Sequence, residues 1–186
     1  MASGFPLLVA DVHLRTSEAL YQACRFPHRP GVQSVIIAQR SPMTAKMKSR
    51  AHLDETRSDW DQVRVRVMRW CLRVKLAQHP ESFGQVLADT DSMPIVEESR
   101  RDDYWGAIRR GHDLVGHNVL GRLLMELRAE WLSGELLRLD SVPEPDVADF
   151  RLLGRQIGRV ANTANPADSR QPDSTDLDQP RLSDSW

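Results

Sequence analysis

The sequence predicts a mainly α-helical protein that folds as one multi-helical domain with a small β element near its N-terminus. Between residues 17 and 139, apolar residues recur every three or four positions in several stretches, which is the spacing of one helix face. Residues 5–14 are apolar and β-branched enough for a strand. A chain of 186 residues can bury one ordinary core, so we expect one domain.

The composition argues against several classes of protein. A net charge of −1 gives no overall field that would attract nucleic acid or a membrane. The N-terminus lacks the pattern of a signal peptide, and no apolar run is long enough to span a bilayer. Cys24 and Cys71 lie in helical patterns without metal-ligand spacing, so we expect buried free thiols in the cytoplasm. The six histidines are scattered, and we expect neither a metal site nor a cofactor.

Residues 5–14 are expected to form an edge strand or a short hairpin, since Pro6 cannot donate a hydrogen bond to a sheet. Thr16 is a suitable N-cap for a helix that stops before residue 27, a proline. Glu18 and Gln22 are four residues apart and therefore share one face of this helix. An acidic residue in a first turn commonly serves the helix dipole alone, so the residues by themselves leave the role of Glu18 open.

Two short helices are expected next. Residues 28–31 predict a turn, and residues 32–40 have the apolar spacing of a helix. Ser41 is followed by a proline, which together favour the start of a helix over residues 43–50. Lys46 lies in this helix, and a polar connection follows.

The longest helix is expected over residues 58–79, with Ser58 and Asp61 as a capping box and Pro80 at its end. Its apolar stripe consists of Trp60, Val63, Val67, Cys71 and Val74. Its other faces carry Arg64, Arg66, Arg69, Arg73 and Lys75. Such a basic row is usually solvated, although it also suits a phosphate group. A short helix is expected at residues 81–90.

Residues 97–116 concentrate polar chemistry. A short apolar stretch, 94–96, suggests a strand, and acids, arginines, Tyr104, Trp105 and a glycine follow it closely. Carboxylates beside flat rings suit an enzyme that handles a sugar and a heterocycle. The alternative is a solvated loop that one tryptophan anchors.

The C-terminal third begins with a strongly amphipathic helix over residues 117–139. Asn118 and two flanking glycines at its start can bring backbone N–H groups close to a ligand oxygen, or they simply allow close helix packing. Residues 145–161 have the spacing of one more amphipathic helix. Residues 162–186 are rich in Pro, Asp and Ser and poor in apolar residues, so a disordered acidic tail is expected.

Six segments together resemble the NADAR family, also called YbiA-like. They are TSEALYQACRF (16–26), SPMTAKM (41–47), RSDWDQVRVRVMRWCLRVKLAQH (57–79), VLADT (86–90), IVEESRRDDYWG (95–106) and GHNVLGRLLMELR (116–128). No single segment is specific, but their combination, in the family's order and spacing over about residues 5–132, is quite specific. On this resemblance we expect a NADAR domain at residues 1–140.

The resemblance implies a mainly α-helical, YbiA-like domain with a small β element that acts as an N-glycosidase, a hydrolase of N-glycosyl bonds. One branch of the family cleaves the bond between ribose phosphate and pyrimidine in phosphoribosylaminopyrimidine intermediates of riboflavin biosynthesis. Another branch removes ADP-ribose from guanine in nucleic acid. A third alternative is an inactive module that binds ADP-ribose or another nucleotide. The near-neutral charge favours the small-molecule substrate.

The resemblance also implies site residues. Glu18 and Asp102 are the expected catalytic pair, with one carboxylate near ribose C1 and the other near the leaving nitrogen. Motif positions give the expected substrate-binding residues Gln22, Lys46, Trp60, Glu97, Tyr104, Trp105 and Asn118. Without the resemblance, Trp60 is more simply a helix anchor and Asp102 a turn cap.

The chain departs from the family pattern at its N-terminus. Family domains usually begin with an aromatic segment, a glycine and then S-N-F or S-N-M, and residues 1–6 look like the continuation of that pattern. We therefore expect a chain that starts at an internal methionine or is a natural truncation, and that lacks roughly twenty residues belonging to the family's substrate pocket.

Overall fold

The structure is a computed structural model and describes residues 4–134 and 140–161. Its helices are α1 (Ser17–Ala23), α2 (Pro30–Ile37), α3 (Pro42–Arg50), α4 (Trp60–Gln78), α5 (Gln85–Ala88) and α6 (Val119–Leu132), with a 3-10 turn η1 (Leu53–Glu55) and a π-helical turn η2 (Pro80–Gly84). Its strands are β1 (Leu7–Val9), β2 (Val12–Leu14), β3 (Ile108–Arg110), β4 (Asp113–Val115), β5 (Ser141–Val142), β6 (Arg151–Leu152), β7 (Arg155–Gln156) and β8 (Val160–Ala161). The strands form four antiparallel pairs, β1–β2, β3–β4, β5–β8 and β6–β7. The predicted mainly α-helical class is confirmed.

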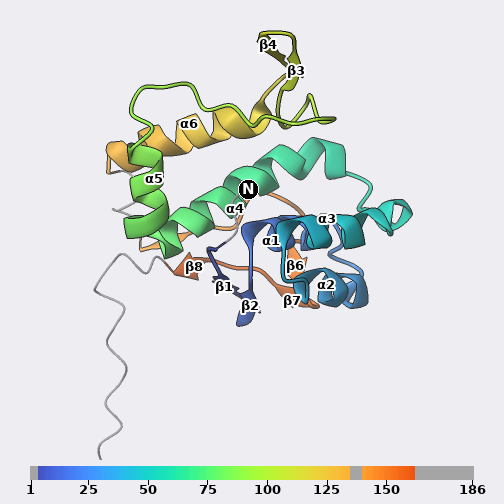
Figure 1. Ribbon diagram of the computed structural model, residues 1–186. Coiled ribbons are helices and arrows are strands. Elements are labelled where there is room, and N and C mark those ends of the chain that lie inside the picture. Colours follow the sequence, from blue (N-terminus) through green and yellow to red (C-terminus); the bar gives the residue numbers. More distant parts are fainter. Residues whose placement is uncertain (1–3, 135–139, 162–186) are drawn as a thin grey trace, which may run out of the picture.

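Helix α4 runs through the middle of the molecule, and the other helices cover it on two sides (Figure 1). On one side α1, α2 and α3 pack against one another, and α1 contacts α4. On the other side α6 contacts both α4 and α5. The predicted apolar stripe of α4 is buried between these layers, with Val67, Cys71 and Val74 fully inaccessible. This central helix therefore fixes the positions of the elements that surround it.

Of the two expected alternatives for residues 5–14, the hairpin β1–β2 is present. Its two turn residues, Ala10 and Asp11, have positive φ angles of 50° and 61°, as a tight hairpin turn requires. Thr16 then caps α1 as predicted, because its hydroxyl oxygen accepts a hydrogen bond from the Ala19 N–H at 3.1 Å.

Two further helices differ from the prediction at most in their bounds, and a third is divided. Helix α2 starts at Pro30, inside the predicted turn, because the φ of proline already suits a first helical position. Helix α3 follows the predicted cap, Ser41. The helix expected at residues 81–90 is divided into η2 and α5.

The predicted capping box of α4 is wrong. The helix begins at Trp60 behind Asp59, and no side chain of Ser58 or Asp61 caps it. The Asp59 carboxylate instead accepts two hydrogen bonds from Arg57.

Between α5 and α6 the strand suggested for residues 94–96 is not formed. Backbone groups of Ile95 and Glu97 bind the Asn118 side chain rather than a neighbouring strand. The sequence did not indicate the hairpin β3–β4 that follows. This hairpin stands away from the body of the molecule (Figure 1).

The helix predicted for residues 145–161 is wrong. The segment contains the strands β6, β7 and β8 instead. Phe150, Leu152, Ile157 and Val160 are still buried, and Val147 and Leu153 are half-buried. Phe150 packs edge-on against Trp70 of α4, with ring centres 4.9 Å apart. Leu153 and Gly154 have positive φ and turn the chain between β6 and β7, which no helix allows. The segment thus completes the core in an extended form.

Cys24 and Cys71 are free and buried, as expected. No described helix is both long and apolar enough to cross a bilayer. The expected tail at 162–186 and the last residues of the helix predicted for 117–139 lie outside the described residues.

Candidate active site

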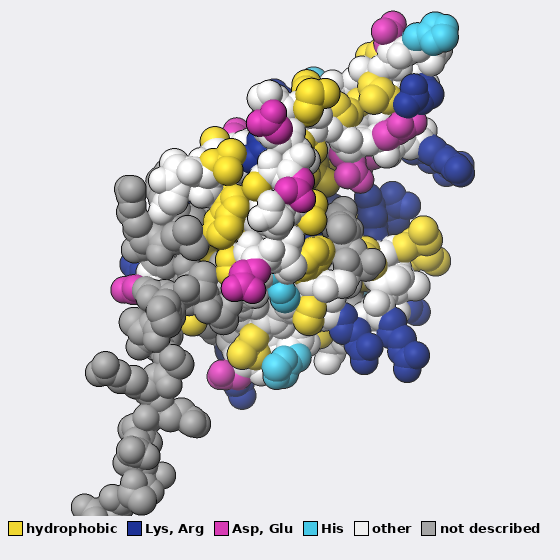
Figure 2. All heavy atoms as spheres, turned by 60° about the vertical axis from the view of Figure 1, so that its left-hand side comes forward, with side chains coloured by type: hydrophobic (Ala, Val, Ile, Leu, Met, Phe, Trp, Pro, Cys, Tyr) yellow, Lys and Arg dark blue, Asp and Glu magenta, His cyan; other side chains and the backbone are white. Residues whose placement is uncertain are grey.

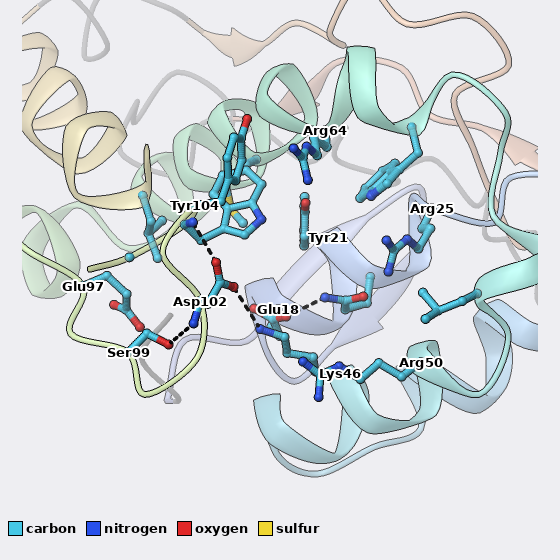
Figure 3. Close-up of a pocket in the computed structure, with 17 residues that line it drawn as sticks. Glu18, Tyr21, Arg25, Lys46, Arg50, Arg64, Glu97, Ser99, Asp102 and Tyr104 are labelled. Carbon is cyan, nitrogen blue, oxygen red and sulfur yellow. Dashed lines mark hydrogen bonds and ion pairs between the residues drawn. The ribbon is translucent and has the colours of Figure 1, made fainter. Parts of the chain in front are cut away.

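A cavity of about 340 Å³ opens between α1, α3, α4 and the loop of residues 97–106 (Figure 3). Its volume is within the range of small-molecule sites. Eight of the nine site residues predicted from the sequence line it: Glu18, Gln22, Lys46, Trp60, Glu97, Asp102, Tyr104 and Trp105. Asn118 is the exception, since it does not line the cavity but holds the loop in place.

Helix α1 supplies one wall. Glu18, Tyr21, Gln22 and the following Arg25 are three or four residues apart, so they face the cavity together. Gln22 Nε2 donates a hydrogen bond to Glu18 Oε1 at 2.8 Å, which orients the carboxylate. Burial, and then the charge of Glu18, raise the pKa of Tyr21, so its hydroxyl stays protonated.

Helices α3 and α4 extend the same wall. Lys46 and Arg50 lie four residues apart on α3, and Trp60 and Arg64 lie four residues apart on α4. Figure 3 shows the basic side chains of this wall directed toward the cavity. We call the α1, α3 and α4 side of the cavity the helix wall.

The basic row of α4 is divided between two roles. Arg64 lines the cavity, whereas Arg69 and Arg73 form ion pairs with Glu126 and Glu130 of α6 at 2.9 and 2.5 Å. Of these three arginines, Arg64 is the one placed to meet a ligand, and its binding of phosphate stays a prediction.

The loop of residues 97–106 forms the opposite side, which we call the loop wall. Asp102 both caps a turn and faces the cavity. Its Oδ1 accepts a hydrogen bond from the Trp105 N–H at 2.9 Å, and its own N–H donates to Ser99 Oγ at 3.1 Å. Its Oδ2 lies 3.8 Å from Lys46 Nζ on the helix wall. One oxygen thus serves the fold, and the other is available for chemistry.

Asn118 holds the loop wall from behind. It has a left-handed backbone conformation (φ 48°), which asparagine tolerates better than most residues. Its Oδ1 accepts from the Glu97 N–H at 3.0 Å, and its Nδ2 donates to the Ile95 carbonyl at 2.8 Å. A Cβ at Gly106 would collide with the carbonyl of Glu97, and one at Gly121 with that of Ile95. Close backbone approach therefore explains the glycines of this motif, and the predicted contact of Asn118 with substrate stays a prediction.

Aromatic rings lie between the charged groups. Trp60 is only 5% exposed and packs on Tyr21, with ring centres 5.2 Å apart. The guanidinium carbon of Arg25 lies 5.1 Å from the Trp60 ring centre, and that of Arg64 lies 4.0 Å from the Tyr104 ring centre. These cation–π contacts orient the two arginines without neutralising them.

The cavity combines four cations with three carboxylates. Two of the cations have ion-pair partners, since Lys46 lies 3.8 Å from Asp102 and Arg64 lies 3.5 Å from Asp61. Among the residues that the structure describes, Arg25 and Arg50 have no carboxylate partner within ion-pair distance. Burial lowers the pKa of Arg25. Unpaired guanidinium groups in a concave site suit an anionic ligand such as a phosphate ester. Within residues 4–134 and 140–161, no group of three His, Cys, Asp or Glu residues is placed to hold a metal ion.

Sequence reasoning did not single out Tyr21, Arg25, Arg50 or Arg64 as site residues. The available signal was their spacing, because each lies three or four residues from a predicted site residue, on the same helix or, for Arg25, just beyond its end.

Comparison with known proteins agrees with this arrangement. Residues 4–132 match the NADAR domain. The chain is 36% identical over 131 residues to N-glycosidase YbiA of Escherichia coli (strain K12), covering 69% of this chain and 77% of that protein. It is also 36% identical over 132 residues to a riboflavin biosynthesis protein of Vibrio vulnificus, covering 70% of this chain but 35% of that longer protein.

A solved structure supports the same conclusion. The NMR structure of E. coli YbiA superposes with a TM-score of 0.60 at 36% sequence identity, covering 72% of this chain and 76% of that one. The resemblance inferred from six sequence segments is confirmed, and the chain belongs to the NADAR domain family.

Proposed function

We propose that this chain, a hydrolase acting on N-glycosyl bonds, cleaves the bond between ribose phosphate and the amino group of a phosphoribosylaminopyrimidine. The curated relatives include proteins named N-glycosidase and proteins named for riboflavin biosynthesis. The observation that carries the proposal is the cavity itself, where Glu18 and Asp102 lie among four basic side chains.

Hydrolysis of such a bond needs two acid–base functions. As the C1–N bond breaks, positive charge develops on the ribose and electron density moves to the leaving nitrogen. One carboxylate stabilises the cation and takes a proton from the attacking water, and the other group protonates the leaving amine. Figure 3 shows Glu18, Asp102 and Lys46 converging on one side of the cavity, where these functions would be performed. The products are ribose 5-phosphate and the free aminopyrimidine.

The rest of the lining suits the rest of the substrate. Arg25, Arg50 and Arg64 supply the donors that a phosphate group accepts. Tyr104 and Trp105 are half-buried and offer more ring surface to a pyrimidine than the buried Trp60 does. We therefore assign base stacking to the loop wall and treat Trp60 as the anchor of the adjacent arginine.

Removal of ADP-ribose from guanine in nucleic acid is the second candidate function. It is favoured by exposed basic residues in the loop wall and on the projecting hairpin, namely Arg100, Arg101, Arg110 and His112. In the view of Figure 2, Lys and Arg side chains gather along one edge of the molecule. A polyanion would bind such an edge by counterion release.

Mass spectrometry of two substrates side by side distinguishes these functions. One is a phosphoribosylaminopyrimidine, and the other is an oligonucleotide that carries ADP-ribosylated guanine. Release of ribose 5-phosphate from the first supports the proposal, and release of ADP-ribose from the second alone supports the nucleic-acid function. Folded protein that turns over neither, yet binds ADP-ribose in calorimetry, would instead be the inactive binding module.

A further inference from the structure

Gln33 ties the end of α1 to the C-terminal hairpin β6–β7. The side chain is fully buried on α2. Its Nε2 donates to the carbonyl of Ala23, the last residue of α1, at 3.0 Å and to the carbonyl of Arg151 at 2.9 Å. Its Oε1 accepts from the Leu153 N–H at 2.6 Å. The Gln33 amide thus links α1, a helix that lines the cavity, to Arg151 and Leu153. These two residues follow Gln33 by 118 and 120 positions in the sequence.

Arg57 makes a second tie. Its side chain is 7% exposed. Nε and Nη2 donate to the two carboxylate oxygens of Asp59 at 2.5 and 2.9 Å, and Nη2 also donates to the Ala148 carbonyl at 2.7 Å. The Arg57 backbone N–H donates to the Arg25 carbonyl at 3.1 Å. Since Asp59 directly precedes Trp60, the tie reaches the first residue of α4 as well.

The turn that Gln33 holds is a strained one. Leu153 has a φ of 50° and Gly154 a φ of 81°. A leucine in the left-handed region is strained, and it persists where its surroundings fix it. The hydrogen bond to Gln33 and the full burial of the neighbouring Leu152 supply that constraint.

Both ties meet behind Arg25. Among the described residues its guanidinium has no carboxylate partner within ion-pair distance, and it lies 5.1 Å from the ring centre of Trp60. The backbone at residues 23–25 and the start of α4, which the two ties hold, therefore determine where it points. The tying segment lies beyond the NADAR match, which ends at residue 132. We propose that residues 140–161, acting through Gln33 and Arg57, set the position of Arg25 and thereby the affinity of the cavity for the anionic part of its substrate. In this scheme Gln33 and Arg57 are positioning residues, and the inference rests on the proposed function for its choice of substrate.

Double-mutant cycles in the full chain test the inference. Gln33→Met and Arg57→Lys are each made with Arg25 intact and with Arg25→Ala. Turnover of the phosphoribosylaminopyrimidine gives kcat/KM, calorimetry with ribose 5-phosphate gives Kd, and thermal melts report folding. Gln78→Met is a matched control. The Gln78 side-chain amide also accepts a hydrogen bond from a backbone N–H and donates one to a backbone carbonyl, both of Leu8, but Gln78 does not line the cavity.

With Arg25 intact, we expect each variant to lower kcat/KM about tenfold and to weaken ribose 5-phosphate binding about tenfold. In the Arg25→Ala background, we expect each loss to be less than about twofold, since residues that act through a shared partner are not additive. Equal losses in both backgrounds, or an equal loss in Gln78→Met, overturn the inference. If Gln33→Met does not fold, the Arg57→Lys variant alone tests the inference.

A wild type that binds ribose 5-phosphate without turnover contradicts the proposed function, and the binding cycle still tests the positioning of Arg25. A wild type that does neither overturns both.

Discussion

The two walls of the cavity are built in different ways. The helix wall takes its side chains from three helices, each at a spacing of three or four residues, and the helices are fixed by buried contacts such as those of Ala19 and Leu20. The loop wall gathers its side chains from ten consecutive residues and is held by hydrogen bonds from Asn118 and by glycines. Helix packing therefore positions Lys46, Arg50 and Arg64, whereas a few polar contacts position most of the carboxylates.

The largest expected effect concerns the one proposed catalytic carboxylate on each wall. Glu18→Gln and Asp102→Asn keep a side-chain oxygen that can accept the bonds from Gln22 and Trp105. Each should lower kcat by roughly 10²–10⁴-fold, because a neutral amide can neither take up a proton nor stabilise a cation. Thermal melts should stay nearly unchanged. If both variants unfold, the pair is structural, and if both keep full activity, the catalytic assignment is wrong.

The support of the loop wall should give the next largest effect. Asn118→Gly permits the same backbone conformation but loses both side-chain bonds. It should lower kcat/KM by about ten- to hundredfold and cost about 1–3 kcal/mol for each buried backbone group left unsatisfied.

Asn118→Asp separates support from ligand binding. It keeps an acceptor for the Glu97 N–H and loses only the donor to Ile95. We expect an intermediate loss of kcat/KM. A loss as large as that of the glycine variant would instead favour the substrate contact that the family motif implied.

The helix wall should respond mainly in KM. Arg64→Gln removes a cation that faces the cavity, so KM should rise about tenfold while kcat changes little, since a phosphate contact is made in both ground and transition states. Arg69→Gln is the control, because its ion pair with Glu126 on the surface is worth about 0–1 kcal/mol. Equal KM values for the two variants would show that the wall does not bind anion.

A cation that belongs to neither wall gives the smallest expected effect on activity. Burial lowers the pKa of Lys75 from its ordinary 10.5 to about 8, and its ammonium lies 4.0 and 3.8 Å from the rings of Phe5 and Phe83. Between these pH values the folded state has lost a proton that the unfolded chain still holds. The free energy of unfolding of the wild type should therefore rise between about pH 8 and pH 10.5. Below pH 8 the folded state contains the buried charge and is destabilised by its full desolvation cost.

Lys75→Met should remove that rise. At pH 7 the variant should be more stable by about 1–3 kcal/mol, because the charge cost outweighs the cation–π contacts. Urea denaturation at pH 7 and pH 9.5 checks this, with kcat/KM unchanged. A variant less stable than wild type at pH 7 would mean that the cation–π contacts of Lys75 stabilise the folded state by more than the burial of its charge destabilises it.

Apolar periodicity located most of the helices, because it is a local pattern. The family resemblance pointed to nine site residues, and eight of them line the cavity. Sequence reasoning missed Arg25 and Arg64 as site residues because helical spacing alone does not say which neighbour faces a cavity. It failed at residues 145–161, where the spacing of Phe150, Leu153 and Ile157 is as compatible with a helix as with short strands joined by turns. The choice between them depends on contacts with Gln33 and Arg57, more than ninety residues away.

The tie between Gln33 and the C-terminal hairpin has a consequence for biosynthesis. During translation the first helices emerge long before residues 151–153. The side-chain amide of Gln33 can therefore bond the nearby carbonyl of Ala23 early, but it must wait for Arg151 and Leu153. Contacts of such large sequence separation form late and slow folding. A ribosome-bound chain that ends near residue 132 would therefore already contain every residue that lines the cavity, and would still lack the contacts that hold Arg25 in place.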